Sequence, residues 1–129
     1  KLGQPEIKAG LASIVGSYLM TMHLGLSKNI ELSLTGELIS GQIAYDIGIL
    51  NHLVPRAEVM AKSLGLATEM AKLAPTALRL TKQSFRKLTQ TGFDAALEAA
   101  KAAQKEAYAS GEPQAAMRKF LEARKTKKV

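Results

Sequence analysis

The sequence has no cysteine and no tryptophan, and only 5% of its 129 residues are aromatic. Without cysteine the chain can form no disulfide, no thiol nucleophile and no cysteine-ligated metal site. This absence fits a reducing compartment, so we expect a cytoplasmic protein. No apolar run approaches the ~18 residues that a membrane-spanning helix needs, and we expect no membrane partner. Alanine and leucine dominate instead, which favours helices because these side chains lose little rotamer freedom there.

The first residues do not resemble a natural start. The sequence opens with Lys1 rather than methionine. Its first residues do not show the charged segment followed by an apolar segment that is typical of a secretory leader. We therefore expect this sequence to begin inside a longer protein.

Apolar residues in the first half recur at helical spacing. Val15, Leu19, Met22 and Leu26 would share one face of a helix. A shorter apolar stretch over residues 30–34 would end at a left-handed glycine, Gly36. Ser40 is a suitable N-cap for a third, short helix.

Residues 49–54 form a short apolar run between Gly48 and Pro55, which predicts a β-strand. A single strand cannot make a sheet. Its partner strands would have to lie outside this sequence, or the segment would pack as an isolated extended piece.

From residue 56 onward the pattern predicts four amphipathic helices, separated at Pro75, at Gly92 and at the turn 110–113. The predicted fold class is therefore mainly α. The apolar stripes could cover one another or be covered by a neighbouring subunit, and the pattern leaves both possibilities open.

Few side chains suit chemistry. Ser13 and Ser17 lack the G-x-S-x-G context of a nucleophile elbow. His23 and His52 lie far apart with no acidic cluster beside them, so we expect no metal site. Glu6 follows Pro5, whose ring restricts the backbone of residues 4 and 5. A carboxylate held rigidly beside apolar residues suits a general acid or base, although a structural or solvated glutamate fits the same pattern.

The net charge is +7, and much of the excess lies near the C-terminus. Six basic residues stand against the single acid Glu122 there: Arg118, Lys119, Arg124, Lys125, Lys127 and Lys128. Such a cluster attracts phosphates, although a solvated tail explains it equally. Nucleic acid is not an expected partner, because stacking aromatics and a recognisable DNA-binding motif are both absent.

Four segments, taken together, resemble the enoyl-CoA hydratase/isomerase (crotonase) superfamily. Residues 3–11 resemble its F-G-x-P-E-x-x-x-G-L segment, and residues 31–40 its E-x-x-L-T-G-x-x-I-S segment. Residues 44–55 resemble A-x-x-x-G-L-V-N-x-V-V-P, and residues 74–82 resemble S-P-x-A-x-x-x-x-K. The order and spacing of the four segments match the C-terminal portion of that superfamily.

The resemblance implies a fold and a division of the chain. Residues 1–55 would be the C-terminal end of a spiral α/β core that binds acyl-CoA. Residues 56–129 would be a helical region that assembles the subunits into a homo-oligomer, a trimer or hexamer. The partner strands of residues 49–54 would then lie upstream.

The resemblance also implies a reaction. In this superfamily two backbone N–H groups stabilise the enolate of an acyl-CoA thioester, and Glu6 matches the second of two glutamates that act on a water. Coenzyme A belongs to the substrate, so no separate cofactor is expected. A catalytically inert helical assembly module derived from such an enzyme is the alternative.

Two departures from the family pattern concern the substrate. Where the family has a glycine-rich turn beside the acyl group, this chain has Ile14, which would reshape the acyl site. Phe120, Arg124 and Lys125 resemble the family's A-F-x-E-K-R segment near the adenine and phosphates of coenzyme A, with Ala123 in place of its lysine.

Overall fold

The computed structural model describes residues 1–126, and these residues are mostly helical, as predicted. The helical elements, in chain order, are η1 (Pro5–Ala9), α1 (Val15–Thr35), α2 (Gly41–Asp46), η2 (Arg56–Glu58), α3 (Val59–Ala71), α4 (Pro75–Ser110) and α5 (Glu112–Thr126).

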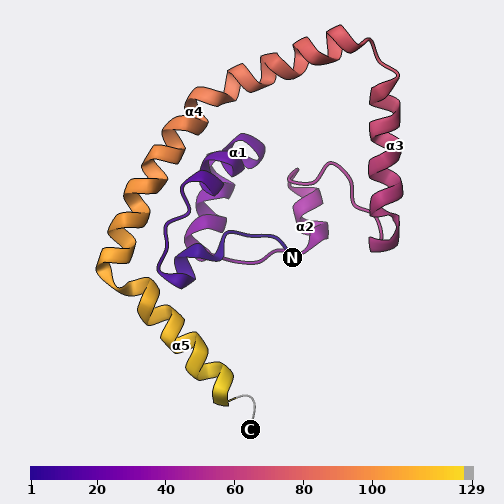
Figure 1. The fold of residues 1–129 in the computed structure, drawn as a ribbon. Coiled ribbons are helices and arrows are strands. Elements are labelled where there is room, and N and C mark those ends of the chain that lie inside the picture. The colour runs from indigo at the N-terminus through magenta and orange to yellow at the C-terminus, as the bar shows by residue number, and fades with distance from the viewer. Residues whose placement is uncertain (127–129) are drawn as a thin grey trace.

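The three C-terminal helices form an open arc around the N-terminal elements (Figure 1). Helix α4 has 36 residues, which corresponds to a length of ~54 Å at the helical rise. Helix α1 lies on the inner side of α4 and contacts it, while α5 contacts both α4 and η1. The short helix η1 also contacts α1, so it is held between α1 and α5.

Helix α1 reverses direction at Gly25, whose φ of 74° and ψ of 167° are not helical. In a straight helix Ser17 and Asn29 would lie ~18 Å apart along the axis. The Asn29 side-chain amide instead donates a hydrogen bond to the Ser17 carbonyl at 2.7 Å. The predicted helical face through Leu26 is therefore wrong at its end, because Leu26 lies beyond the reversal.

Helix α4 continues through Gly92, so the predicted break at this residue is also wrong. Gly92 is where α1 meets α4. A methyl group in place of its hydrogen would lie 2.6 Å from the Tyr18 hydroxyl oxygen. That hydroxyl donates a hydrogen bond to the Thr89 carbonyl at 2.9 Å. The glycine permits close approach between the two helices rather than ending one of them.

The buried apolar core of the described residues is small. It consists of Leu32, Ile39 and Ala44, with Leu2 among the half-buried residues packed against it. Leu2 and Ile39 also exchange backbone hydrogen bonds of 3.0 and 2.8 Å. The first residues of the chain are thereby tied to the segment that follows α1.

Residues 49–54 do not form a strand, contrary to the prediction. Gly48, with φ of 85°, turns the chain after α2. The backbone N–H groups of Ile49 and Leu50 then both bond to the Ala44 carbonyl, at 2.8 and 3.2 Å. These donors satisfy the end of the helix, and both side chains pack against the core. The apolar run reflects that packing and not strand pairing.

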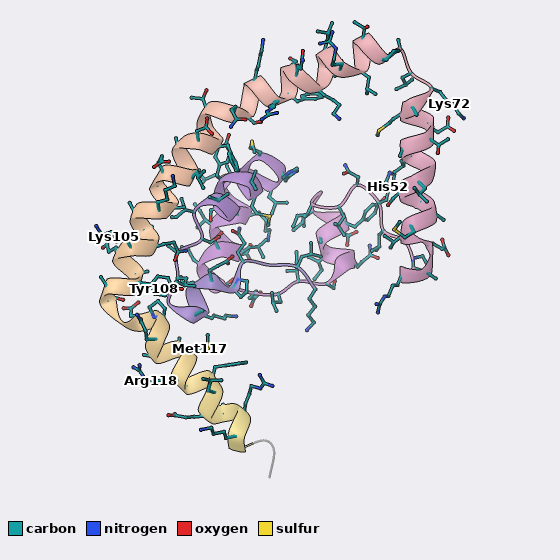
Figure 2. The ribbon with its side chains drawn as sticks, viewed as in Figure 1. His52, Lys72, Lys105, Tyr108, Met117 and Arg118 are labelled. Carbon is teal, nitrogen blue, oxygen red and sulfur yellow. The ribbon has the colours of Figure 1, made fainter. Side chains whose placement is uncertain are left out.

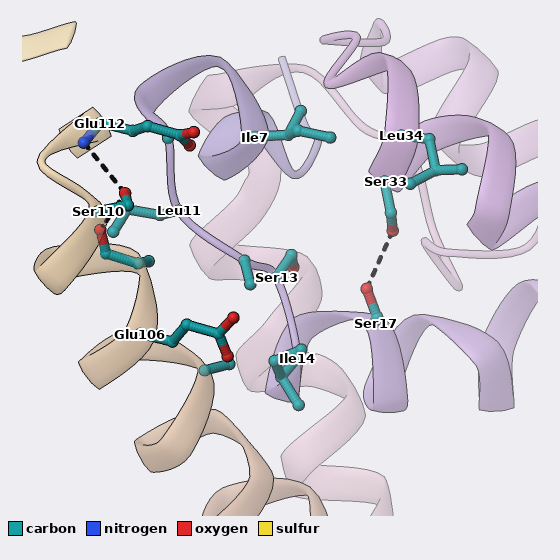
Figure 3. A pocket seen from close by; sticks show the side chains of 14 residues that line it. Ile7, Leu11, Ser13, Ile14, Ser17, Ser33, Leu34, Glu106, Ser110 and Glu112 are labelled. Carbon is teal, nitrogen blue, oxygen red and sulfur yellow. Dashed lines mark hydrogen bonds between the residues drawn. The ribbon is translucent and has the colours of Figure 1, made fainter. Parts of the chain in front are cut away.

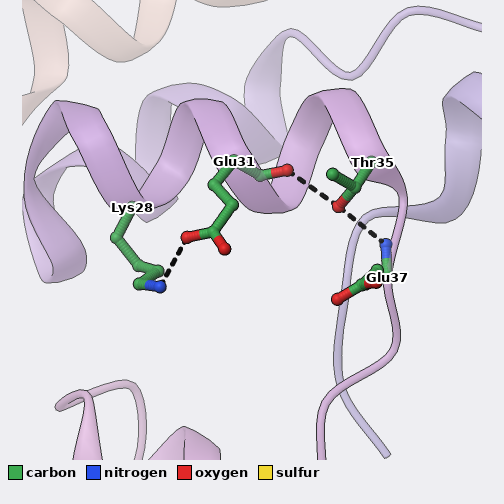
Figure 4. A network of polar contacts seen from close by, with 4 residues as sticks. All are labelled: Lys28, Glu31, Thr35 and Glu37. Atoms are coloured by element: carbon green, nitrogen blue, oxygen red, sulfur yellow. Dashed lines mark hydrogen bonds and ion pairs between the residues drawn. The ribbon is translucent and has the colours of Figure 1, made fainter.

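The predicted helix ends around residues 36–40 are confirmed. Gly36 adopts a left-handed φ of 60°, and its N–H bonds to the Leu32 carbonyl. The Ser40 hydroxyl accepts a hydrogen bond from the Ile43 N–H at 3.1 Å, as an N-cap does. Figure 4 shows how Thr35 ties the end of α1 to the residue after Gly36, since its hydroxyl accepts a hydrogen bond from the Glu37 N–H.

The turn 110–113 separates α4 from α5 as predicted, with Gly111 at φ 79°. None of the helices in residues 1–126 combines the length and apolar character that a bilayer span requires. The division of the chain at residues 55 and 56 stays a prediction. Lys127 and Lys128 of the predicted basic cluster lie outside the described residues.

Gly25→Ala is expected to lower the free energy of unfolding by ~1–3 kcal/mol, because only glycine adopts its φ and ψ without strain. A methyl group at Gly25 would meet no atom within 4 Å, so the cost comes from the backbone.

Gly65→Ala is the matched control, since Gly65 lies inside α3 with the same open surroundings. This change should raise the free energy of unfolding by ~1 kcal/mol through helix propensity. Urea denaturation measures the free energy of unfolding of both variants and of the parent. A Gly25→Ala variant as stable as the parent would contradict the reversal of α1.

Candidate functional site

Glu6 lies in the first turn of η1, directly after Pro5. The turn is closed by the Leu11 N–H, which bonds to the Glu6 carbonyl at 3.0 Å, and by Gly10 in a left-handed conformation. The Glu6 atom Oε2 is buried and accepts no hydrogen bond from residues 1–126. A buried polar atom without a partner is costly, and native structures keep few of them.

The residue that precedes this turn, Gln4, is only 5% exposed. Its amide nitrogen donates to Asn29 Oδ1 and to Ser33 Oγ, both at 3.1 Å. Its amide oxygen accepts a hydrogen bond from the Ser13 hydroxyl. Gln4 therefore joins the N-terminal segment to both the start and the end of α1.

Asn29 is the centre of this arrangement and is 3% exposed. Its amide nitrogen donates to the Ser17 carbonyl and to Thr21 Oγ1, both at 2.7 Å. Because a carbonyl oxygen carries no proton, the Asn29 nitrogen must face Ser17. Its oxygen then faces Gln4 and accepts there. We call the side chains linked in this way the Gln4–Asn29 network: Gln4, Ser13, Ser17, Thr21, Asn29 and Ser33.

The directions of the remaining hydrogen bonds follow. The Ser33 hydroxyl donates its one proton to Asn29 Oδ1 at 2.9 Å. In the 3.1 Å contact between Ser17 Oγ and Ser33 Oγ, Ser17 is then the donor. The protons of the Ser13, Ser17 and Ser33 hydroxyls are thus all committed to atoms of the protein.

A cavity of about 620 Å³ lies between the segment after η1 and helices α1 and α4. Figure 3 shows Ile7, Leu11 and Ile14 along it, with Ser17 and Ser33 on the α1 side. Glu106 reaches in from α4, with its carboxylate on the side where Ser13 and Ile14 lie.

The side chains that line this cavity offer acceptors. The Ser110 hydroxyl donates to the Ala107 carbonyl at 2.7 Å, so its proton is also committed. The other polar side chains of the lining are the carboxylates of Glu106 and Glu112. A ligand group that reaches these side chains therefore gains most by donating a hydrogen bond.

A second cavity of about 830 Å³ lies where α5 meets η1 and the end of α4. Its lining includes Phe120 and also Tyr108, Met117 and Arg118, whose places near the α4–α5 junction are labelled in Figure 2. The Arg124 guanidinium lies over the Phe120 ring, 5.8 Å from its centroid. This cation–π geometry holds a positive charge beside an apolar hollow.

Metal-binding side chains are not gathered in the part of the chain that the structure describes. No group of three or more His, Asp or Glu residues there could hold an ion. Figure 2 shows His52 in the connection between α2 and α3.

The sequence pattern of the enoyl-CoA hydratase/isomerase family matches residues 1–128. This chain belongs to that family. A relative from Thermus thermophilus, named only provisionally as an enoyl-CoA hydratase, is 31% identical over 124 residues. The match covers 96% of this chain and 49% of the relative. The short-chain-enoyl-CoA hydratase of Clostridium acetobutylicum is 29% identical, over 97% of this chain and 48% of that protein.

The fold is also that of a solved family structure. The enoyl-CoA hydratase/isomerase from Pseudoalteromonas atlantica superimposes with a TM-score of 0.85 at 23% identity. The match covers 92% of this chain and 48% of that one. The chain spans about half the length of the curated relatives it matches.

The predicted family site residues fall into separate places. Ile14 lines the first cavity and Phe120 lines the second, whereas Glu6 lines neither of the two. Phe120 and Arg124 are brought together by the ring contact. Lys125 is exposed in the last turn of α5. The structure therefore does not unite these five residues in one pocket.

The Gln4–Asn29 network is not among the features predicted from the sequence, where Ser17 is discussed only as a nucleophile and Asn29 has no assigned role. A signal was present, because Ser17 and Thr21 are four residues apart, as are Asn29 and Ser33. Each pair lies on one helical face, on either side of Gly25. Glu106 was missed as well, since its place depends on how α4 packs.

Proposed function

We propose that this chain takes part in acid–base chemistry on acyl-CoA thioesters, with Glu6 moving a proton at the substrate. Family membership supports the class of reaction. The observation that carries the role of Glu6 is its buried atom Oε2, which no described residue satisfies. A proton-transfer group needs such a free acceptor within reach of the reacting atoms. No cofactor beyond the coenzyme A of the substrate enters this proposal.

The mechanism that we propose needs more than this one carboxylate. An enolate formed by proton removal beside a thioester carries charge on its oxygen, and backbone N–H donors stabilise that charge. We propose that these donors and a second glutamate come from another part of a longer enzyme, of which this chain is the C-terminal portion. The shares of length matched do not themselves support that position. The sequence of the gene on either side of this segment tests it, and motifs of the C-terminal half lying downstream would contradict it.

We propose that the second cavity and the cation beside it receive coenzyme A. Phe120 offers an apolar face, and Arg124 is held against it. Lys125 adds a charge in the same turn. Positive charges placed in this way attract phosphate groups.

We also propose that the protein assembles as a homo-oligomer in the cytoplasm. Large apolar side chains of α3 and α4 are exposed, with Met60 68%, Phe85 65% and Leu88 81% accessible. Apolar surface of this extent favours association. The same observation favours the second candidate function, an inert helical assembly module. Cell fractionation tests the compartment, and recovery in the membrane or secreted fraction would contradict it.

Glu6→Gln is expected to lower turnover of an enoyl-CoA thioester by ~100-fold with little change in KM, because an amide cannot exchange the proton. The variant is tested in the protein that carries this chain, by following the absorbance of the conjugated thioester. Glu37→Gln is the control, since Glu37 is an exposed glutamate. Near-parental turnover of Glu6→Gln would reject the proposed role of Glu6, and an inactive parent would favour the assembly module.

Changing Arg124 and Lys125 together to alanine is expected to weaken binding of coenzyme A by ~3–10-fold at low salt, as exposed charges contribute modestly. The difference should shrink as salt screens the charges. Calorimetric titration measures it. Changing Lys62 and Lys105 to alanine removes the same charge from exposed sites on α3 and α4. Equal affinities for the two double variants would contradict a specific phosphate contact.

Leu88→Asp is expected to lower the mass of the assembly in sedimentation, because a charge would replace an apolar contact between subunits. Gln83→Asp places the same charge at another exposed position of α4 and should leave the mass unchanged. A monomeric parent protein would contradict the proposed oligomer.

A further inference from the structure

We propose that Gln4 and Asn29 are positioning residues, which hold the Glu6 carboxylate in place through the turn that carries it. The inference rests on the proposed function of Glu6. It assigns a role to two buried amides whose contacts lie entirely within the protein.

The first step is the short connection between Gln4 and Glu6. Only Pro5 separates them, and its ring fixes one of the backbone angles between the two residues. Gln4 is also the N-cap residue of η1, directly before its first residue, Pro5. The position of the Gln4 backbone therefore determines where the first turn of η1 lies.

The second step is how firmly Gln4 is held. Its side-chain amide uses both of its protons and its oxygen within the protein, on Asn29, Ser33 and Ser13. A methyl group at Gly16 would collide with the Gln4 side chain. The amide therefore lies in a close-fitting site with a defined direction for each hydrogen bond.

The third step concerns Asn29, which determines the orientation of the Gln4 side-chain amide. Its nitrogen is turned toward the Ser17 carbonyl, so its oxygen is available to Gln4. Asn29 lies in the second limb of α1, beyond the reversal at Gly25. One side chain thus couples the folded-back helix to the turn that carries Glu6.

The choice of amides supports positioning over packing alone. Each hydrogen bond within a protein gives a net stability of only ~1 kcal/mol, and apolar residues of the same shape are often as stabilising. Hydrogen bonds add what apolar contacts lack, which is a fixed orientation. Proton transfer depends on such orientation, since small displacements of a reacting group cost much of the rate.

The test combines two amide-removing variants with Glu6→Gln in the protein that carries this chain. Asn29→Leu and Gln4→Met keep similar volumes and remove the hydrogen bonds. Each is expected to lower kcat by about 10-fold or more and to change KM by less than about 3-fold. In the Glu6→Gln background the same changes should lower kcat by less than about 3-fold, because residues that act through one group are not additive.

Gln42→Leu is the matched control for loss of an amide, because Gln42 is exposed on α2 and its side chain donates to Asp46 Oδ1 at 2.8 Å, outside the Gln4–Asn29 network. Its turnover should equal that of the parent. Equal losses of kcat from Asn29→Leu in the parent and in Glu6→Gln would overturn the inference, since a general loss of structure would act in both. If Asn29→Leu fails to fold, Gln4→Met carries the same comparison.

Hydrogen exchange gives a measurement that does not depend on activity. The Leu11 amide bonds to the Glu6 carbonyl, so its exchange reports on the turn. We expect exchange to be about 10-fold faster or more in Gln4→Met and Asn29→Leu, and unchanged in Gln42→Leu. Unchanged exchange in all three would overturn the inference. Parental turnover of Glu6→Gln would instead contradict the proposed function, and the exchange rates alone would then decide whether the two amides position the turn.

Discussion

The backbone carbonyl of Ser17 sets the direction of the hydrogen bonds that hold the N-terminal part of this protein together. Because it can only accept, it turns the Asn29 amide nitrogen toward itself and leaves the Asn29 oxygen facing Gln4. Gln4 must then present its own nitrogen, and its oxygen is left for Ser13. A single acceptor without a proton therefore orients two amides and the hydroxyls around them.

This arrangement requires α1 to fold back on itself. Gly25 allows the reversal with backbone angles that other residues adopt only under strain. Tyr18, in the first limb of α1, then reaches the backbone of α4 beside Gly92. Gly25 allows the reversal of α1, and Gly92 allows α1 to approach α4. Both glycines therefore help to form the cavity of about 620 Å³, which is lined by α1, α4 and the segment after η1.

The described residues bury little apolar surface for a chain of this length. The core is confined to the region around Leu32, Ile39 and Ala44, while α3 and much of α4 expose large apolar side chains. Buried hydrogen bonds therefore contribute to holding the N-terminal part together, and they are costly when a partner is lost. Large apolar side chains of α3 and α4, such as Met60, Phe85 and Leu88, stay exposed to solvent.

Sequence patterns alone were enough to predict the mainly helical fold, the C-terminal end of α1, the N-terminal end of α2 and the turn before α5. They also carried the resemblance to the enoyl-CoA hydratase/isomerase family. These features depend on local rules, such as left-handed glycines and a serine N-cap, or on ordered motifs. Other features depend on contacts between distant parts of the chain, which local rules do not describe. The tertiary structure gave Gly92 a packing role inside α4, and it turned the backbone donors of residues 49–50 toward the end of α2 instead of a neighbouring strand. It also joined Gln4 to Asn29, because contacts between residues 25 positions apart depend on how the chain folds back.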